Sequence, residues 1–440
     1  MKIVRFISRV FVGLIFIYSG FVKAVDPLGS TYKFIDYFEA FGTSWANNLA
    51  FILAIVLAAA EFVIGVMLLL GIKKKLSAWG ALLFMSIFTP LTLYLALENP
   101  VTDCGCFGDA LILTNWQTFW KNIIIFIPVI IFFAGRKKET IKYNNSAELM
   151  FMATSVVAIM GVSIYCYRHL PIIDFRPYHV GANIKEGMEL PPDAKQDKYE
   201  LKFWYKDKKT GEVKEFNENN YPWEDTINWE FVDSKSELLE VGDHPAIHDF
   251  SIENNKEGDI TEDVLDDDKY VFLLVAYDLK NTDIDGFKKV YPLAEYAQER
   301  GYRFICLTSS LSHEIDSLRD LITEEMDLSF EEPKPLIQRE TVYYYEKDGE
   351  IMEFAEDEQP DSEEGWDLIE ENVIEYEIPQ EPVNSFPIKF YNADEITLKT
   401  IVRANPGLVL LKKVVILRKW HYSDMPDLKE FQEDILLHEN

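Results

Sequence analysis

The chain has 440 residues, of which 48% are hydrophobic and 14% aromatic, and this composition excludes a wholly disordered chain. The formal net charge of −30 is unevenly spread: residues 1–170 carry +5 and residues 171–440 carry −35, which indicates two modules in two environments. The acidic second module excludes nucleic acid as a partner, because phosphate binding needs Lys and Arg, and four cysteines are too few for a disulfide-rich scaffold.

Five apolar stretches precede residue 170, and each has about the 20 residues that cross a bilayer core of roughly 30 Å. They cover residues 6–25, 49–72, 76–97, 116–134 and 149–167. In lipid such segments form helices, because each backbone amide needs a partner within the segment. The sequence therefore predicts an α-helical membrane bundle, with a four-helix domain over 1–140, a fifth span within 141–170 and the lipid bilayer as its surroundings.

Lys and Arg are concentrated in the loops on one side of the predicted bundle, with ten residues against three. An excess of positive charge in short loops marks the cytoplasmic side. The N-terminus is therefore expected in the cytoplasm, and five spans place the C-terminal module in the periplasm of a bacterial inner membrane. The ten residues are Lys2, Arg5, Arg9, Lys73, Lys74, Lys75, Arg136, Lys137, Lys138 and Lys142, and the three are Lys23, Lys33 and Lys121.

Two cysteines, Cys104 and Cys106, stand in the loop between the third and fourth spans, on the expected periplasmic side. Their spacing just allows a bond, and the ring would be strained, with Gly105 easing the bend. Strained, exposed disulfides tend to be catalytic or regulatory. We interpret the pair as a thiol–disulfide exchange site. The alternatives are a fixed bond or two reduced thiols that only shape the loop; a metal site is not expected, because the loop has no histidine.

The other two cysteines differ in their surroundings. Cys166 ends the fifth span, at the same membrane face as the pair, and is a candidate relay thiol. The competing interpretation of Cys166 is a small buried apolar residue. Cys306 lies in an apolar strand pattern and is expected in a core.

Four charged residues of the first two spans and their ends are further candidates, because ionisable groups at membrane depth suggest function. Arg9 lies near the cytoplasmic side, Glu61 falls in the middle of the second span, and Lys23 and Asp26 are three apart, where helical neighbours meet. One interpretation is a polar pocket for a quinone or a proton, which would also suit a transporter. The other is structural: Glu61 accepts hydrogen bonds from a neighbouring helix.

These residues also carry a resemblance. The first four spans resemble the MauE branch of the DoxX-like membrane proteins over roughly residues 1–140. The resemblance implies a four-helix bundle in the plasma membrane that is associated with periplasmic redox maturation. A fifth span and about 270 further residues depart from the family pattern. The matching positions are Arg9, Gly13, Ser19, Gly20, Lys23, Asp26, Pro27, Glu61, Gly65 and the string Cys-Gly-Cys-Phe-Gly-Asp at 104–109.

The C-terminal module begins with a β-rich connecting segment over 171–244, in which residues 199–216 read as a hairpin. Strands and helices then alternate over 245–440, as in an α/β domain. Strands are expected at 270–277, 303–308, 387–391, 408–411 and 414–420, with helices near 286–300, 312–322 and 395–403 and after 426. An acidic insertion over about 331–384 carries its own hairpin with a turn at 348–349.

The order of these elements resembles the thioredoxin fold. Pro406, after Asn405, stands where that fold keeps its cis-proline, and both are candidate binding residues. The fold's usual Cys-x-x-Cys position, here 278–283, has no cysteine, so this domain is expected to bind or position a client rather than exchange disulfides.

The sequence thus favours a multi-pass inner-membrane protein that assists thiol–disulfide chemistry on a periplasmic protein client or redox partner. The exchanging residues would be Cys104 and Cys106. No cofactor is required by the sequence, and a quinone is the cofactor that a pocket in the bundle would take. The alternative is a non-catalytic, membrane-anchored assembly or scaffold protein.

Overall fold

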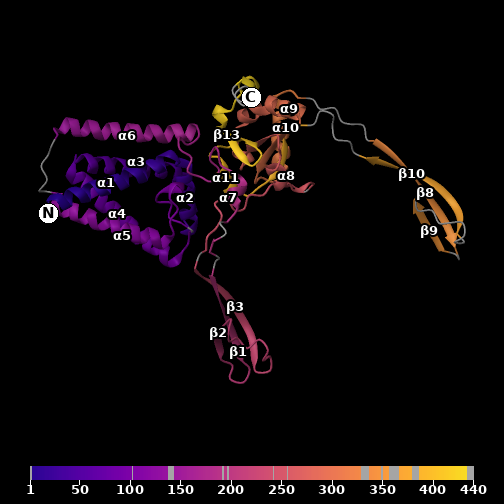
Figure 1. The fold of residues 1–440 in the computed structure, drawn as a ribbon, viewed down its shortest axis with the longest axis horizontal. Helices are drawn as coiled ribbons and strands as arrows, with labels where there is room; N and C mark the ends of the chain where they lie inside the picture. Colours follow the sequence, from indigo (N-terminus) through magenta and orange to yellow (C-terminus); the bar gives the residue numbers. More distant parts are fainter. Residues whose placement is uncertain are drawn as a thin grey trace.

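The computed structural model describes residues 2–101, 103–136, 143–190, 193–195, 198–240, 242–254, 256–328, 336–347, 350–355, 366–378 and 386–433. A helical bundle formed by the first third of the chain stands beside an α/β domain, and two small sheets project from that domain (Figure 1). The loop with Lys137, Lys138 and Lys142 and the predicted hairpin turn at 348–349 lie outside the described residues.

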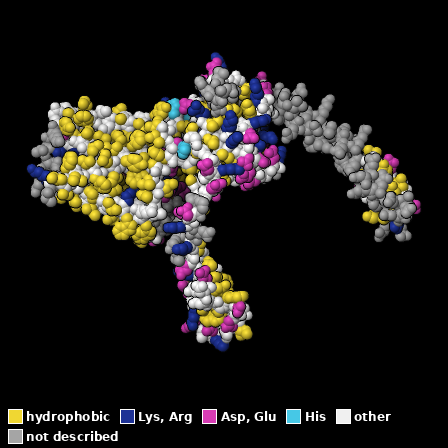
Figure 2. All heavy atoms as spheres, viewed as in Figure 1, with side chains coloured by type: hydrophobic (Ala, Val, Ile, Leu, Met, Phe, Trp, Pro, Cys, Tyr) yellow, Lys and Arg dark blue, Asp and Glu magenta, His cyan; other side chains and the backbone are white. Residues whose placement is uncertain are grey.

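Five helices of the bundle are long and apolar enough to cross a membrane, which agrees with the five predicted spans. On the face seen in Figure 2 most of the coloured side chains of the bundle are hydrophobic, as expected for a surface in contact with lipid. The helices are α1 (Lys2–Val25), α3 (Ala50–Leu70), which the 3₁₀ turn η1 (Ser44–Leu49) extends, α4 (Lys74–Glu98), α5 (Asn115–Gly135) and α6 (Asn145–Arg168).

Helices α1 and α3 pack with their backbones in close approach. A Cβ on Gly20 would lie 2.5 Å from the backbone nitrogen of Phe62, and a Cβ on Gly65 would lie 2.6 Å from that of Ile17. Small residues at such crossings let membrane helices approach closely. The crossing brings the polar side chains of α1 against the middle of α3.

A further helix, α2 (Pro27–Ala40), lies outside every predicted span. The Asp26 side chain accepts a hydrogen bond from the backbone N–H of Gly29 and so caps the helix, and Pro27 occupies its first turn. Helix α2 crosses the end of the bundle that faces the α/β domain (Figure 1). It thereby walls off the bundle interior on that side.

The α/β domain is built on a seven-stranded sheet with the order β13-β12-β6-β7-β11-β4-β5. Strand β6 is parallel to β7, whereas β12 is antiparallel to β6 and β13 is antiparallel to β12. The strands are β4 (Glu253–Asn254), β5 (Gly258–Asp259), β6 (Tyr270–Val275), β7 (Arg303–Thr308), β11 (Lys389–Asn392), β12 (Gly407–Lys412) and β13 (Val415–His421).

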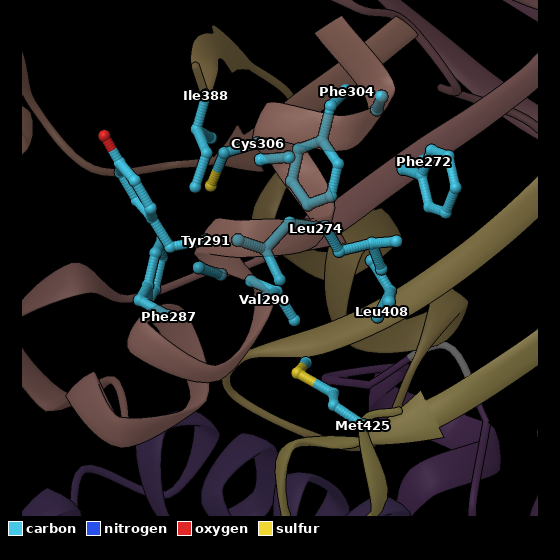
Figure 3. Packing of buried hydrophobic residues seen from close by; sticks show 14 of the residues in the cluster. Phe272, Leu274, Phe287, Val290, Tyr291, Phe304, Cys306, Ile388, Leu408 and Met425 are labelled. Carbon is cyan, nitrogen blue, oxygen red and sulfur yellow. The ribbon is translucent and has the colours of Figure 1, made fainter. Parts of the chain in front are cut away.

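Helices cover both faces of this sheet, and side chains alternate along β6 between two hydrophobic cores. Phe272 and Leu274 pack against α9 and α10 (Figure 3), where Cys306 is fully buried, as predicted. The opposite face packs against α7, α8 and α11. The helices are α7 (Ile184–Met188), α8 (Thr261–Leu265), α9 (Ile284–Arg300), α10 (Ser312–Glu325), α11 (Glu395–Ile401) and α12 (Leu428–Phe431).

Each projecting sheet has three antiparallel strands, one more than the predicted hairpins. In the connecting segment, β1 (Lys198–Asp207) pairs with β2 (Val213–Asn217) as predicted and also with β3 (Trp229–Glu240). In the acidic insertion, β8 (Leu336–Lys347) pairs with β9 (Glu350–Ala355) and with β10 (Asp367–Ile378).

Candidate functional site

Cys104 and Cys106 lie in the loop of residues 99–114 between α4 and α5, which we call the Cys loop and which the structure describes except at residue 102. Both are free thiols. Gly105, between them, has φ +63°, a left-handed conformation that favours glycine. The Asp103 carboxylate accepts a hydrogen bond from the Gly105 backbone N–H. The turn thus holds both cysteines on the same short stretch of chain.

Helix α2 holds the outer side of the Cys loop. The Lys33 ammonium lies 2.7 Å from the Asp103 carboxylate, and the Tyr37 hydroxyl donates a hydrogen bond to the Cys104 carbonyl at 2.9 Å. Helix α2, which the hydropathy pattern did not predict, therefore holds both a side chain and a backbone carbonyl of the loop.

A buried polar cluster in the bundle, Ser19, Lys23 and Glu61, holds the inner side of the loop. We call it the Lys23 cluster. The Lys23 ammonium lies 2.8 Å from a Glu61 carboxylate oxygen, and Ser19 donates to the same oxygen at 2.7 Å. Lys23 also donates to the Cys106 carbonyl at 2.5 Å, and the Ser19 hydroxyl, whose single hydrogen can serve either acceptor, lies 2.9 Å from the same carbonyl. A charge pair that is satisfied in this way can persist in an apolar bundle.

Lys23 and Asp26, which are three apart in the sequence, have different partners in the structure. Asp26 turns away from α1 to cap α2, and it accepts two hydrogen bonds from Arg403 of the α/β domain, at 3.1 Å and 2.9 Å. The partner of Lys23 is Glu61, 38 residues along the chain. The backbone change at Pro27 separates two residues that a continuous helix would have placed together.

The two thiols differ in acidity. A hydrogen bond from the Cys104 thiol lowers the pKa of Cys106 to about 6; the charges of Lys121 and Lys23 act in the same direction, against burial. The same hydrogen bond, together with burial, raises the pKa of Cys104. Cys106 is therefore the thiolate of the pair at neutral pH, and Cys104 stays protonated.

This difference predicts the pH dependence of alkylation. Because the pKa of Cys106 is lowered, its reaction with iodoacetamide should rise through pH 6 and level off near neutral pH, whereas an ordinary thiol still gains rate near pH 9. Peptide mass spectrometry of the full chain would assign each rate. Lys121→Gln should move the Cys106 profile to higher pH; identical profiles for Cys104 and Cys106 would contradict the assignment.

A cavity of about 270 Å³ adjoins both cysteines inside the bundle. Its walls come from α1 to α5 and the Cys loop, and most of its lining is aromatic or aliphatic. Polar groups gather at the end where the cysteines lie. The lining includes Phe16, Ser19, Lys23, Lys33, Phe34, Tyr37, Phe38, Phe41, Leu57, Glu61, Phe84, Phe88, Cys104, Cys106, Phe107, Lys121 and Asn122.

The α/β domain contacts the Cys loop directly. Arg403, which is 6% exposed, donates to Asp26 and also to Asp109 of the loop at 3.0 Å. Nearby, the hydroxyls of Tyr32 on α2 and Tyr277 after β6 are 3.2 Å apart. Arg403 thus joins three parts of the chain: the end of α1, the Cys loop and the segment after α11.

A second cavity, of about 240 Å³, lies on this outer side, between α2, the Cys loop and α11. Its lining is more polar than that of the first cavity and includes Asp26, Tyr32, Asp103, Asp109, Lys399 and Arg403. Lys33 and Gly105 line both cavities. The Cys loop therefore separates an apolar chamber within the bundle from a polar one beneath the α/β domain.

The remaining predicted residues lie apart from the cysteine pair. Arg9 donates to the Leu68 carbonyl near the end of α3, and Cys166 is buried on α6 and lines neither cavity. A relay role for Cys166 stays a prediction. The Asn405–Pro406 peptide bond is cis, and the Asn405 side chain donates to the Asp278 carbonyl in the segment that follows β6.

The sequence analysis did not assign four residues to the site: Ser19, Tyr37, Lys121 and Arg403. Ser19 was noted only within the family pattern, and Lys121 only as a loop charge. Arg403 and Tyr37 sit in ordinary helical or loop contexts, and no spacing links them to the cysteines. Within the described part of the chain, no group of three or more His, Cys, Asp or Glu side chains is arranged to hold a metal ion.

The bundle and the loop on it define a multi-pass membrane protein with a cysteine pair at the end that faces an α/β domain. Residues 1–135 form a MauE family domain, matching the family described as methylamine utilisation protein MauE. Residues 199–240, which form the sheet of β1 to β3, match a domain of unknown function, DUF8463. No curated protein and no solved structure matches the chain.

Proposed function

We propose that this membrane protein carries out thiol–disulfide exchange through Cys104 and Cys106, and that the pair acts as a disulfide donor. The observation that carries the proposal is the pair of free thiols on one turn of the Cys loop, beside the Lys23 and Lys121 side chains, whose charges help to lower the pKa of Cys106. A stabilised thiolate favours the reduced pair, and dithiols of this kind are oxidising. Their disulfide form accepts electrons from clients.

The chemistry conserves atoms and electrons. A client thiolate attacks the Cys106 sulfur, which is the less buried of the oxidised pair, the Cys104–Cys106 bond breaks, and the Cys104 sulfur takes up a proton. A second client thiol loses its proton and attacks the client sulfur of this mixed disulfide. The client then leaves as a disulfide, and Cys106 is released as its stabilised thiolate. The product is the thiol pair that the structure shows.

We propose further that the α/β domain has a thioredoxin-like fold and serves as a binding module. The order β13-β12-β6-β7, with β6 and β7 parallel and the other pairs antiparallel, supports this assignment, as does the position of Pro406 before β12. The segment 278–283 has no cysteine, so exchange would rest on the membrane pair. The positive charge bias supports an inner-membrane location with this domain in the periplasm.

The reaction of the reduced protein with glutathione disulfide tests the proposed exchange. The wild-type protein should end with a Cys104–Cys106 disulfide and release two glutathione molecules. Cys104→Ser should stop at a lasting glutathione adduct on Cys106, since the serine hydroxyl can still donate to the thiolate but cannot resolve the adduct. Cys106→Ser, the matched control, should react at least about ten-fold more slowly, because the remaining thiol is buried and burial still raises its pKa after the Cys106 thiol is removed. Mass spectrometry of the intact protein distinguishes these products, and equal adduct formation by both variants would contradict the assigned roles.

The second candidate function is a membrane-anchored scaffold without exchange activity. The missing Cys-x-x-Cys at 278–283 and the exposed apolar side chains on the projecting sheets, such as Phe231 and Val373, favour it. It predicts no adduct in either variant. A transporter using Glu61 has less support, because the cavity beside Glu61 is mainly apolar.

A further inference from the structure

The apolar cavity beneath the Cys loop has no role in the exchange itself. If the pair donates disulfides, as proposed above, each turnover leaves two thiols that must be reoxidised. We propose that the cavity binds the ring of a membrane quinone, which takes up these electrons. The inference rests on the proposed exchange function and names the electron acceptor of the same site.

The cavity has the composition that a quinone ring requires. Phenylalanines from two helices, Phe34 and Phe38 of α2 and Phe84 and Phe88 of α4, face it, and Phe84 and Phe88 stack at 4.3 Å. Flat aromatic walls suit a flat conjugated ligand. A volume of about 270 Å³ is close to the roughly 300 Å³ at which small-molecule pockets begin, and so fits a head group rather than a long tail.

The cavity also reaches the surface of the bundle. Phe41, at the end of α2, lines the cavity and is 41% exposed, and its ring lies 5.8 Å from that of Tyr94 on α4. Tyr94 is itself 46% exposed, and Leu93 and Leu97 of the same helix are exposed as well. A ligand dissolved in the membrane could therefore place its ring in the cavity and keep its tail in the lipid. A water-soluble acceptor would not need this access from the membrane.

A cation stands where negative charge would develop. The Lys121 ammonium lies 4.3 Å above the Phe107 ring, lines the cavity and lowers the pKa of Cys106. Among the described residues no carboxylate lies within ion-pair distance of Lys121, whereas Lys23 is paired with Glu61. Lys121 is thus placed to stabilise first the thiolate and then the reduced ring.

The step balances. The Cys106 thiolate and the Cys104 thiol form one S–S bond, giving up two electrons and one proton. The quinone takes up both electrons and two protons, one from Cys104 and one from solvent, and becomes the quinol. No metal or further carrier is needed for this transfer.

Two tryptophan variants on α3 test the inference. Leu57 lines the cavity, whereas Leu53, one turn earlier, is 37% exposed on the outer surface of the bundle. The full chain, reduced and purified in detergent, would be mixed with a short-tailed ubiquinone, and quinol formation followed by absorbance. Wild type and Leu53→Trp should reduce one quinone per cysteine pair, while Leu57→Trp should be at least ten-fold slower. Phe88→Ala, which removes one aromatic wall, should raise the KM for quinone several-fold.

The reaction with glutathione disulfide, measured on the same samples, separates the two proposals. Leu57→Trp and Phe88→Ala should both react with glutathione disulfide at the wild-type rate, which also shows that they are folded. Exchange without quinone reduction in the wild type, or quinone reduction unchanged in both cavity variants, would overturn the quinone site and leave the exchange function standing. If the wild type reacts with neither reagent, both proposals fall.

Discussion

Replacing Glu61 by alanine is expected to destabilise the bundle by about 3–5 kcal/mol, the usual cost of removing one partner of a buried ion pair. Glu61 is 4% exposed and Lys23 7% exposed, so the variant would leave the Lys23 ammonium unpaired among apolar helices. Thermal unfolding of the full chain in detergent would record the loss as a lowered midpoint.

The double variant Lys23→Met/Glu61→Leu should recover most of this stability, because replacing a buried ion pair by apolar side chains of similar size is often neutral. In this variant the Cys106 carbonyl would still lose its hydrogen bond from Lys23, and only the Ser19 hydroxyl would remain to donate to it. A double variant as unstable as Glu61→Ala would contradict the view that the ion pair, rather than residue volume, is responsible.

Replacing Arg403 by alanine is expected to release the α/β domain from the Cys loop. The guanidinium is the shared partner of Asp26 and Asp109, so its loss leaves two carboxylates facing each other beside a buried surface. Burial raises the pKa of Asp109, and the charge of Arg403 counters that rise. In the variant the pKa of Asp109 should therefore rise further.

Amide hydrogen exchange of the full chain would measure this release. Exchange should accelerate in α11, in α2 and in the Cys loop, while β6 and β7 in the sheet interior keep their protection. Arg418→Ala removes an exposed arginine of β13 and is the matched control, for which no change is expected. Unchanged exchange in α11 and the Cys loop of Arg403→Ala would show that other contacts hold the domain in place.

Long apolar runs and strand–helix alternation made much of the fold predictable. The five spans follow from hydropathy alone, and β6, β7, β12 and β13 from continuous apolar patterns between turn signals. Helix α2 was not predictable in this way, because it is short and of mixed polarity. The third strands of the two projecting sheets, β3 and β10, lack a clear apolar alternation.

The site was only partly predictable, and for a different reason. Cys104 and Cys106 stand close together in sequence, and their chemistry can be inferred from that spacing. The partners that define their environment come from distant parts of the chain: Glu61 from α3, Lys121 from α5 and Arg403 from the α/β domain. Helical spacing alone would place Lys23 beside Asp26, but α1 ends at Val25 and Asp26 caps α2 instead.

A redox titration of the cysteine pair tests the central claim most directly. The full chain in detergent would be equilibrated in buffers of varied glutathione to glutathione disulfide ratio, quenched by alkylation and analysed as the peptide that carries Cys104 and Cys106. The account predicts one reversible two-electron transition between two alkylated thiols and one intact disulfide, at a potential more oxidising than that of a structural disulfide. A disulfide that survives excess glutathione, or thiols that never join, would contradict it.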